Sequence, residues 1–332
     1  MSLFTPHRRS SQWIMQQVIV ACIPGIVLLT VLLGFGSLMN IFWACLFALS
    51  GEAFVMYWRK RPIKSTVADG SALMTAIVLA IALPPASAWW LIAIASLFAI
   101  VIAKHAYGGL GYNLFNPAMA GFALVLVSVP QAFLHWPTAD FIGAQDALSI
   151  SLGLTSLPDH YTAATALHIV KHNQSLLVEQ LWQAHPQLSW LADTPSQWIS
   201  LAFLLGGLYL LARGIYSWHA PVAMLLSLGV CALFFYDEGS SASAGSPLLH
   251  WFAGGTVFAA FFVITEPVTS AASAKGKLIF GTLIGVLIFF LRHYSSYTDA
   301  IAFSVLLANC CVPIIDQFSQ PKPLKSTGKH DD

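Results

Sequence analysis

The sequence predicts an all-α polytopic membrane protein with about ten transmembrane helices. Of its 332 residues, 57% are hydrophobic and 9% are charged, and the mean hydropathy is +0.73. A soluble domain with so few charges could not cover that much apolar surface, so the bilayer must be its main solvent. The apolar residues also gather into ten runs separated by polar breaks, which is typical of a chain that crosses a membrane repeatedly.

The ten runs differ in length, and several are shorter than the ~20 residues that a straight transmembrane helix needs. We expect the short ones to be tilted, broken or shielded by neighbouring helices. The runs are residues 18–38, 41–58, 71–83, 89–103, 118–135, 199–212, 220–236, 249–265, 278–291 and 300–316.

Lys and Arg residues predict which side of the membrane each connection occupies. If the N-terminus is cytoplasmic, ten crossings place thirteen of the 15 Lys and Arg residues inside. Only Lys171 and Arg292 then lie outside, and cytoplasmic connections are known to carry this excess of positive charge. We therefore expect both termini to be cytoplasmic and residues 137–198 to lie outside.

The chain divides into four regions around the long polar interval. Residues 1–136 hold five spans, 137–198 form an outer loop domain with a helical pattern over 163–183, 199–316 hold five more spans, and 317–332 form a cytoplasmic tail. Because each half has an odd number of spans, homologous halves would be inverted relative to each other. Polar breaks at corresponding places, 69–72 with 265–271 and 116–118 with 298–300, favour such a repeat.

The most polar break is the Gly-rich stretch 108–117, GGLGYNLFNP. Gly111 permits close approach of a ligand to the backbone, and the amides of Asn113 and Asn116 offer both donors and acceptors. This pattern suits the pyrimidine edge of a flavin, with Tyr112 and Phe115 available for stacking. The alternative is a simple loop in which the two Asn residues cap the next helix, with Pro117 in its first turn.

Acidic residues near the spans are candidates for cation or proton handling, because charge inside a bilayer is costly. They are Glu52, Asp69, Glu266, Asp299 and Asp316. Glu52 is the deepest, and we take Glu52, Asp69, Glu266 and Asp299 as the ion-path candidates. For the acids at span ends, helix capping is an equal alternative.

The outer interval contains DHYTAATALH, residues 159–168. Asp159, Thr162, Ala164 and Thr165 are similar to the Asp-x-x-(Ser/Thr)-(Gly/Ala)-Ala-Thr signature at which a flavin transferase attaches FMN, through its phosphate, to the final Thr. The plain alternative is an Ala-rich helix start. We expect no metal site, because His168 and His172 lack a third ligand and the five Cys residues lack zinc spacing.

Four further segments extend the resemblance over nearly the whole chain: DGSALMTAIVLAIALPP from Asp69, GGLGYNLFNPAMAG from Gly108, TEPVTSAASAKGKLIFG from Thr265 and YTDAIAFSVLLANCCVPIID from Tyr297. Together they resemble the family that comprises the RnfD membrane protein of the Rnf ion-translocating oxidoreductase and the related NqrB protein of the Na⁺-translocating NADH:quinone oxidoreductase. One departure is Ala166, where many relatives have Pro after the flavin-bearing Thr.

The resemblance implies a ten-helix subunit of a complex in the bacterial inner membrane that moves Na⁺ or H⁺ with electron transfer. It further implies covalent FMN on Thr165 and a second, noncovalent flavin, riboflavin or FMN, near Gly111, Asn113 and Asn116. The implied partners are the other Rnf subunits (A, B, C, E and G), a flavin transferase for maturation and membrane lipid, with no nucleic acid. Such a subunit is a relay and does not catalyse the whole reaction alone.

Two other classes fit the span pattern without the resemblance. A secondary transporter also has inverted repeats and broken helices, but it has no use for a flavin signature. A structural membrane scaffold would need neither a flavin nor the acids.

Overall fold

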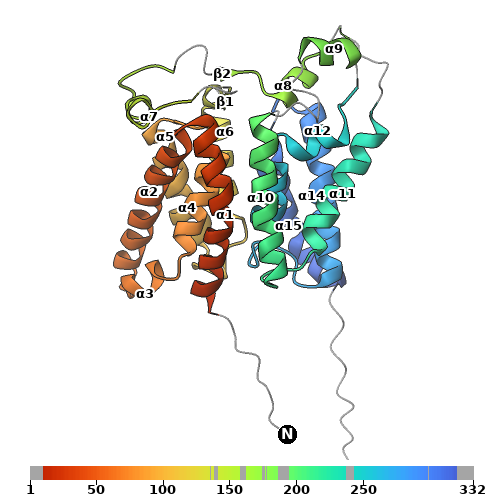
Figure 1. The fold of residues 1–332 in the computed structure, drawn as a ribbon. Coiled ribbons are helices and arrows are strands. Elements are labelled where there is room, and N and C mark those ends of the chain that lie inside the picture. The colour runs from red at the N-terminus through yellow and green to blue at the C-terminus, as the bar shows by residue number, and fades with distance from the viewer. Residues whose placement is uncertain are drawn as a thin grey trace, which may run out of the picture.

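The computed structural model describes residues 10–134, 136–137, 141–157, 162–173, 176, 178–185, 194–236, 243–297 and 299–319. In this part of the chain the backbone is mostly helical, and the long helices stand side by side in two groups (Figure 1). The connections between residues 136 and 185 lie across one end of both groups, at the top in Figure 1.

The first group consists of helices that precede this outer segment. They are α1 (Ser11–Leu33), α2 (Gly36–Trp58), α3 (Ile63–Val67), α4 (Ser71–Ala82), α5 (Trp89–Leu97) continuing as the π-helix η1 (Phe98–Ala106), and α6 (Pro117–Ser128), which is followed by the 3₁₀ turn η2 (Pro130–Phe133). The run 118–135 therefore ends as an α-helix at Ser128, because Pro130 starts a tighter turn there.

The second group consists of helices that follow the outer segment. They are α10 (Pro195–Ala212), α11 (His219–Phe234), α12 (Pro247–Phe252), α13 (Thr256–Phe258) continuing as the π-helix η5 (Ala259–Val263), α14 (Ala274–Tyr294) and α15 (Ile301–Ser319). The run 249–265 is thus a broken element, because Gly254 and Gly255 adopt left-handed backbone angles between α12 and α13. Such a break agrees with the expectation for the short runs.

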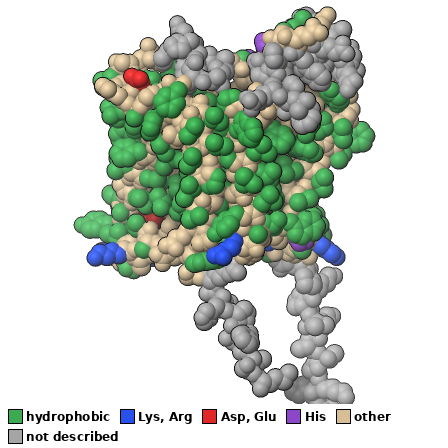
Figure 2. Space-filling model, in the orientation of Figure 1, with side chains coloured by type: hydrophobic (Ala, Val, Ile, Leu, Met, Phe, Trp, Pro, Cys, Tyr) green, Lys and Arg blue, Asp and Glu red, His purple; other side chains and the backbone are tan. Residues whose placement is uncertain are grey.

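Among the described residues, six helical stretches are long and apolar enough to cross a bilayer: α1, α2, α5 with η1, α10, α14 and α15. Shorter apolar helices, α4, α6 and α11, pack among them. A broad band of hydrophobic side chains covers the visible surface between the two ends, and Lys and Arg side chains gather along the lower edge (Figure 2). This is the surface of a multi-pass membrane protein.

The outer segment departs from the expected single helix over 163–183. It contains β1 (Trp136–Pro137), α7 (Ala144–Ser151), β2 (Thr162–Ala163), α8 (Ala166–Lys171) and α9 (Val178–Ala184). The helix is interrupted because the Asn173 side chain bonds to the backbone of Leu176, accepting from its N–H at 3.1 Å and donating to its C=O at 2.8 Å. The antiparallel pair β1–β2 is a small exception to the all-α prediction.

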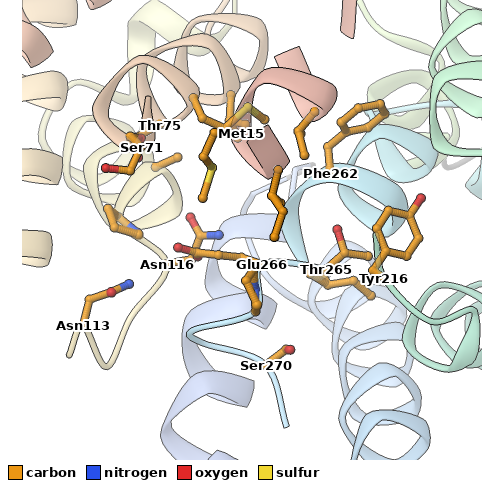
Figure 3. Close-up of a pocket in the computed structure, with 18 of the residues that line it drawn as sticks. Met15, Ser71, Thr75, Asn113, Asn116, Tyr216, Phe262, Thr265, Glu266 and Ser270 are labelled. Carbon is orange, nitrogen blue, oxygen red and sulfur yellow. The ribbon is translucent and has the colours of Figure 1, made fainter. Parts of the chain in front are cut away.

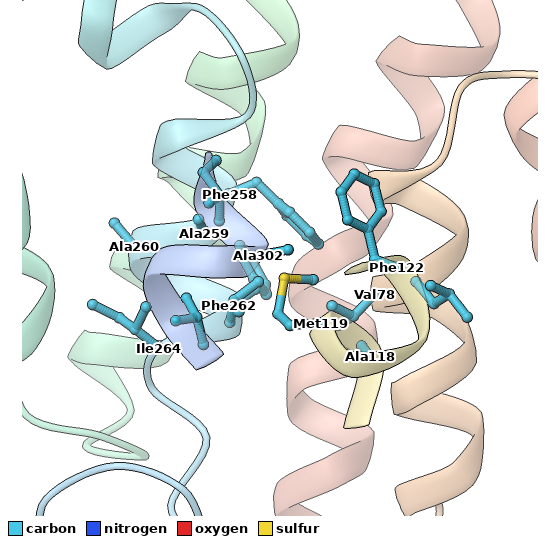
Figure 4. Packing of buried hydrophobic residues seen from close by; sticks show 14 of the residues in the cluster. Val78, Ala118, Met119, Phe122, Phe258, Ala259, Ala260, Phe262, Ile264 and Ala302 are labelled. Atoms are coloured by element: carbon cyan, nitrogen blue, oxygen red, sulfur yellow. The ribbon is translucent and has the colours of Figure 1, made fainter. Parts of the chain in front are cut away.

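The two groups meet along a continuous apolar interface. Helix α1 contacts α10, and α6 contacts α15. The first helices of the two groups are therefore in contact with each other, and so are the last helices. Figure 4 shows Met119 and Phe122 of α6 facing Phe258 and Phe262 of the α13–η5 element, with Ala302 of α15 between them. This interface forms the centre of the core and one wall of the cavity discussed below.

Within the second group, α11 and α14 approach closely at small residues. A Cβ on Gly281 would lie 3.0 Å from the Cα of Ala220, and a Cβ on Gly285 would lie 3.0 Å from the backbone nitrogen of Leu228. In a membrane, where lipid tails are as apolar as Leu, this close backbone contact is a main source of helix association.

We therefore expect Gly281→Val to lower the stability of the folded chain by about 1–3 kcal/mol through overpacking. Thermal unfolding of the purified chain in detergent measures the effect as a lower Tm. Ile279→Val on the same helix is the matched control, since Ile279 is exposed on the lipid-facing surface. Equal Tm values for the two variants would show that α11 and α14 are not in close contact.

Candidate functional site

A cavity of about 280 Å³ lies where the two helix groups meet, near the start of α1. Figure 3 shows its walls, with Met15, Ser71, Thr75 and Asn116 from the first group. Tyr216, Phe262, Thr265, Glu266 and Ser270 line it from the second group. Its size is close to the lower end of the range for ligand cavities, ~300–1,000 Å³, and its wall is largely apolar with a few polar groups, as in such cavities.

Asn116 holds the cavity wall together. Its Oδ1 accepts from the N–H of Met119 at 3.1 Å and caps α6, with Pro117 in the first turn, so the capping alternative is confirmed for this residue. Its Nδ2 donates to the carbonyl oxygen of Val263 at 3.3 Å, and its backbone N–H donates to Oδ1 of Asn309 at 3.1 Å. The capping bond uses the side-chain oxygen and the Val263 bond one amide hydrogen, which leaves less of this amide for a ligand.

Asn113 is the more available of the two amides. It is buried at the cavity wall, and its Nδ2 donates to the carbonyl oxygen of Phe115 at 3.2 Å. Its Oδ1 is buried and has no hydrogen-bond partner among the described residues. A buried amide oxygen without a donor costs about 1–3 kcal/mol. This oxygen is therefore free to accept a hydrogen bond from a group in the cavity.

The expected stacking residues do not line the cavity. Tyr112 is 75% exposed, and Phe115 packs against Tyr107. That these rings stack on a ligand stays a prediction. Gly111 also lies outside the lining; its φ of +91° shows that it is needed for the turn. The aromatic walls come from Phe262 and Tyr216 of the second group, which no local sequence pattern indicated.

The four ion-path candidates fall into two kinds. Asp69 accepts from the N–H of Ser71 at 2.7 Å, and Asp299 accepts from the N–H of Ile301 at 3.2 Å, so both hold the starts of helices. Glu266 lines the cavity, and its Oε2 accepts from the hydroxyl of Thr269 at 3.0 Å. Glu52 is fully buried in α2, where Lys104 pairs with it at 2.5 Å. The structure therefore brings Glu52, Lys104 and Glu266 to one region and leaves Asp299 elsewhere.

Thr165 lies at the end of the molecule opposite the cavity, at the start of α8 (Figure 1). It is the N-cap of α8, and its Oγ1 accepts from the N–H of His168 at 3.3 Å, so the expected helix start at this residue is confirmed. Ala164 beside it is exposed. Thr162 belongs to β2, where it pairs with Pro137. Asp159 lies outside the described residues.

Helix α8 rests on the second helix group. A Cβ on Gly254 would come within 2.6 Å of Cδ1 of Leu167, so this side chain lies directly against the α12–α13 break. Lys171 donates to the carbonyl oxygens of Ser295 and, at 3.1 Å, Tyr297. Burial lowers the pKa of the Lys171 ammonium and also the pKa of His168, with His172 and Lys171 adding to the second shift.

Arg292 organises the surface on which α8 rests. Its Nη1 donates to the carbonyl oxygen of His250 at 3.0 Å, and its Nη2 donates to Oγ1 of Thr256 at 2.9 Å and to the carbonyl oxygen of Gly254 at 3.4 Å. The guanidinium thus satisfies carbonyl groups that the break leaves without helical partners. The charge distribution along the sequence identifies Arg292 only as one of two outer cations.

The sequence of the chain is similar to proteins of one family. A family model described as "NQR2, RnfD, RnfE family" matches residues 1–325. The RnfD protein of the ion-translocating oxidoreductase complex of Pseudomonas aeruginosa (strain UCBPP-PA14) is 46% identical over 322 residues, covering 96% of this chain and 94% of the relative. The corresponding protein from Cellvibrio japonicus (strain Ueda107) is 41% identical over 337 residues, covering 97% and 94%.

A third relative of that name, from Shewanella denitrificans, is 44% identical over 324 residues, covering 93% of this chain and 92% of the relative. The similarity therefore spans both helix groups and the outer segment. On this evidence the chain belongs to the NQR2, RnfD, RnfE family.

Proposed function

We propose that the chain is a membrane subunit of an ion-translocating oxidoreductase complex that relays electrons through two flavins and couples this to Na⁺ or H⁺ movement. The observation that carries the proposal is the cavity between the helix groups. Asn113, with its buried amide oxygen unpaired among the described residues, and the acid Glu266 both line it. Relatives named for this activity match the chain over nearly its full length. The other subunits of such a complex are its partners, and a flavin transferase matures it.

The outer flavin is FMN, joined through its phosphate to Thr165. Three features support this assignment: the signature at residues 159–165, the position of Thr165 at a helix start, and the exposure of Ala164 next to it. A phosphoester keeps the cofactor from being lost while leaving its ring free. The transporter alternative gives no role to these features.

The second flavin, riboflavin or FMN, occupies the cavity without a covalent bond. A flavin ring supplies the N–H that Oδ1 of Asn113 lacks, and Phe262 with Tyr216 supplies apolar and aromatic walls. When bound, the ring accepts and donates electrons; the protein holds it, excludes water and places Lys104 and Glu266 at its border. Asn116 contributes chiefly by fixing the wall.

The orientation follows from the charges. Arg59, Lys60, Arg61 and Lys64 lie around α3, at the end opposite the segment that carries Thr165 (Figure 1). By the positive-inside rule the α3 end is cytoplasmic, the outer segment is periplasmic, and both termini are cytoplasmic in the bacterial inner membrane. The matching contacts α1–α10 and α6–α15 support ten spans in two inverted halves.

Among the acids, Glu52 and Glu266 are the strongest ion-path residues. Asp69 and Asp299 each accept a backbone hydrogen bond that holds a helix start, which explains an acid at those places without ion transport. Glu52 is buried, and Glu266 borders the cavity.

The assignment of covalent FMN is tested with Thr165→Val, which removes the attachment oxygen. The chain, produced with its transferase, should fluoresce on a denaturing gel, and this variant should not. Because Val also removes the cap of α8, at a cost of about 0.5–2 kcal/mol, Thr165→Asn is the matched control: it keeps a cap but offers no hydroxyl. Both variants should insert and lack fluorescence, whereas FMN mapped to Thr162 by peptide mass spectrometry would contradict the assignment.

The noncovalent flavin is tested with Asn113→Leu. Loss of one buried hydrogen bond to the ring should weaken binding by roughly 5–150-fold, from about 1–3 kcal/mol. Acid-extractable flavin per chain should fall, while covalent flavin stays. Tyr112→Leu is the control in the same loop, because Tyr112 is exposed and does not line the cavity. If the two variants retain equal extractable flavin, the ring does not bind at Asn113.

Single-cysteine labelling in intact cells tests the orientation, on a background without native Cys residues. Gln183 in α9 and Ser65 in α3 are both exposed, at opposite ends of the molecule. A membrane-impermeant maleimide should label Gln183→Cys before lysis and Ser65→Cys only after it. The opposite pattern would reverse the topology.

A further inference from the structure

Lys104 is a buried cation that contacts both the carboxylate of Glu52 and the cavity between the helix groups. It is 2% exposed, in the π-helix η1. Its Nζ donates to Oε1 of Glu52 at 2.5 Å and to Oγ of Ser71 at 2.6 Å. The Lys104 side chain also lines the cavity between the helix groups. One ammonium therefore stands between a buried carboxylate and a ligand cavity.

Lys104 contacts only one of the two carboxylate oxygens of Glu52. Its Oε1 receives Lys104 and also lies 3.3 Å from Nε2 of His105, whereas its Oε2 is buried and has no partner among the described residues. The side chain of Glu52 is fully buried. A buried carboxylate that lost its counter-charge would be unfavourable by several kcal/mol, so something positive must always accompany it.

The neighbouring charges define what can compensate Glu52 if Lys104 moves. His105 faces the same oxygen, and Arg59 is occupied by the carbonyl oxygen of His105 at 2.6 Å. Asp69 accepts from the hydroxyl of Ser71 at 2.5 Å. Because Ser71 in turn accepts from Lys104, the negative charge of Asp69 helps to hold the Lys104 ammonium near the start of α4. Glu266 also lines the cavity, close enough to Lys104 for their charges to interact. Within the described residues, Lys104 is therefore the one ammonium beside Glu52.

We propose that Lys104 is a tethered cation that fills a monovalent-cation site at Glu52 and leaves it when negative charge enters the cavity. A Lys ammonium sits on a flexible four-carbon stem, so Nζ can turn toward the cavity without movement of the backbone. Glu52 then binds one H⁺ or Na⁺, with the free Oε2 as its first ligand. Charge balances, because each negative charge in the cavity is matched by one cation at Glu52.

This arrangement makes the cavity and the carboxylate reciprocally linked sites. Whatever draws Lys104 toward the cavity raises the affinity of Glu52 for a cation, and a cation at Glu52 raises the affinity of the cavity for an anionic ligand. The proposal rests on the proposed function only in taking a redox cofactor as the source of negative charge. The exchange of Lys104 for a free cation is a property of this chain alone.

The test removes the tethered cation and asks whether a free one replaces it. In Lys104→Met the full-length chain, purified in detergent, keeps Glu52 without its ammonium. Its Tm should rise by a few degrees when NaCl replaces choline chloride at equal ionic strength, if the site takes Na⁺. If the site takes H⁺ only, Tm should instead rise as the pH falls, because protonation neutralises Glu52. The wild-type chain should show neither response, since Lys104 already occupies the site.

Three variants make the result interpretable. Lys104→Met combined with Glu52→Gln should lose both responses and be more stable than the two single variants predict, because the residues interact directly. Lys64→Met, at an exposed Lys of α3, should behave as wild type. If Lys104→Met responds to NaCl and pH as the wild-type chain does, or if the double variant keeps the response, the proposal is wrong. Flavin content is measured in parallel: its absence from the wild-type chain would sink the proposed function but leave this result standing.

Discussion

The hydrogen bonds of Asn116 satisfy backbone groups where the start of α6 and the end of η5 meet α15 inside an apolar body. Its side chain caps α6 and reaches the carbonyl oxygen of Val263 at the end of η5, while its N–H bonds to Asn309 of α15. Asn309 in turn donates to the carbonyl oxygen of Thr269 at 2.9 Å. Each unsatisfied backbone group at membrane depth costs several kcal/mol, so two amides permit the breaks that a cavity requires. Continuous helices would have filled this space.

The two buried cations Arg292 and Lys104 have different roles. Arg292 donates to carbonyl oxygens and a hydroxyl, several of which a planar guanidinium can satisfy at a time, and the nearby carboxylate of Asp299 stabilises its charge. Because Arg does not lose its charge, it makes a permanent clamp on the α12–α13 break. Lys104 donates directly to the carboxylate of Glu52, and its compact ammonium is held through one flexible stem. A fixed cation suits the α12–α13 break, and the exchange that we propose for Lys104 requires a mobile cation at the wall of the cavity.

The sequence predicts the helical membrane fold well because each residue adds nearly independently to the preference of a segment for lipid or water. The summed hydropathy of a segment therefore indicates whether it spans the membrane. The sequence also predicts Thr165 at a helix start and Asn116 as a cap, since both rules are local. It does not predict where the run 249–265 breaks, the π-helices η1 and η5, or the turn at Asn173 that splits the outer helix. These depend on tertiary contacts, such as Leu167 against Gly254, that no local pattern encodes. The cavity shows the same limit: Tyr112 adjoins Asn113 in the sequence yet points into solvent, whereas Phe262, far away in the sequence, lines the wall.

The outer segment ties the two helix groups together at the end opposite the cavity. Residues that follow α6 pair with Thr162 and Ala163 through β1–β2, and the N–H of Phe35 donates to the carbonyl oxygen of Ile142 at 2.9 Å. A few residues later α8 rests on the second group through Leu167 and Lys171. Thr165 therefore lies on a short bridge between the groups, and any change in their spacing would be carried to it. The two helix groups contact each other through α1–α10 and α6–α15. Both proposed flavin positions lie where the groups meet, one on the bridge and one in the cavity, so a shift of one group against the other would affect both.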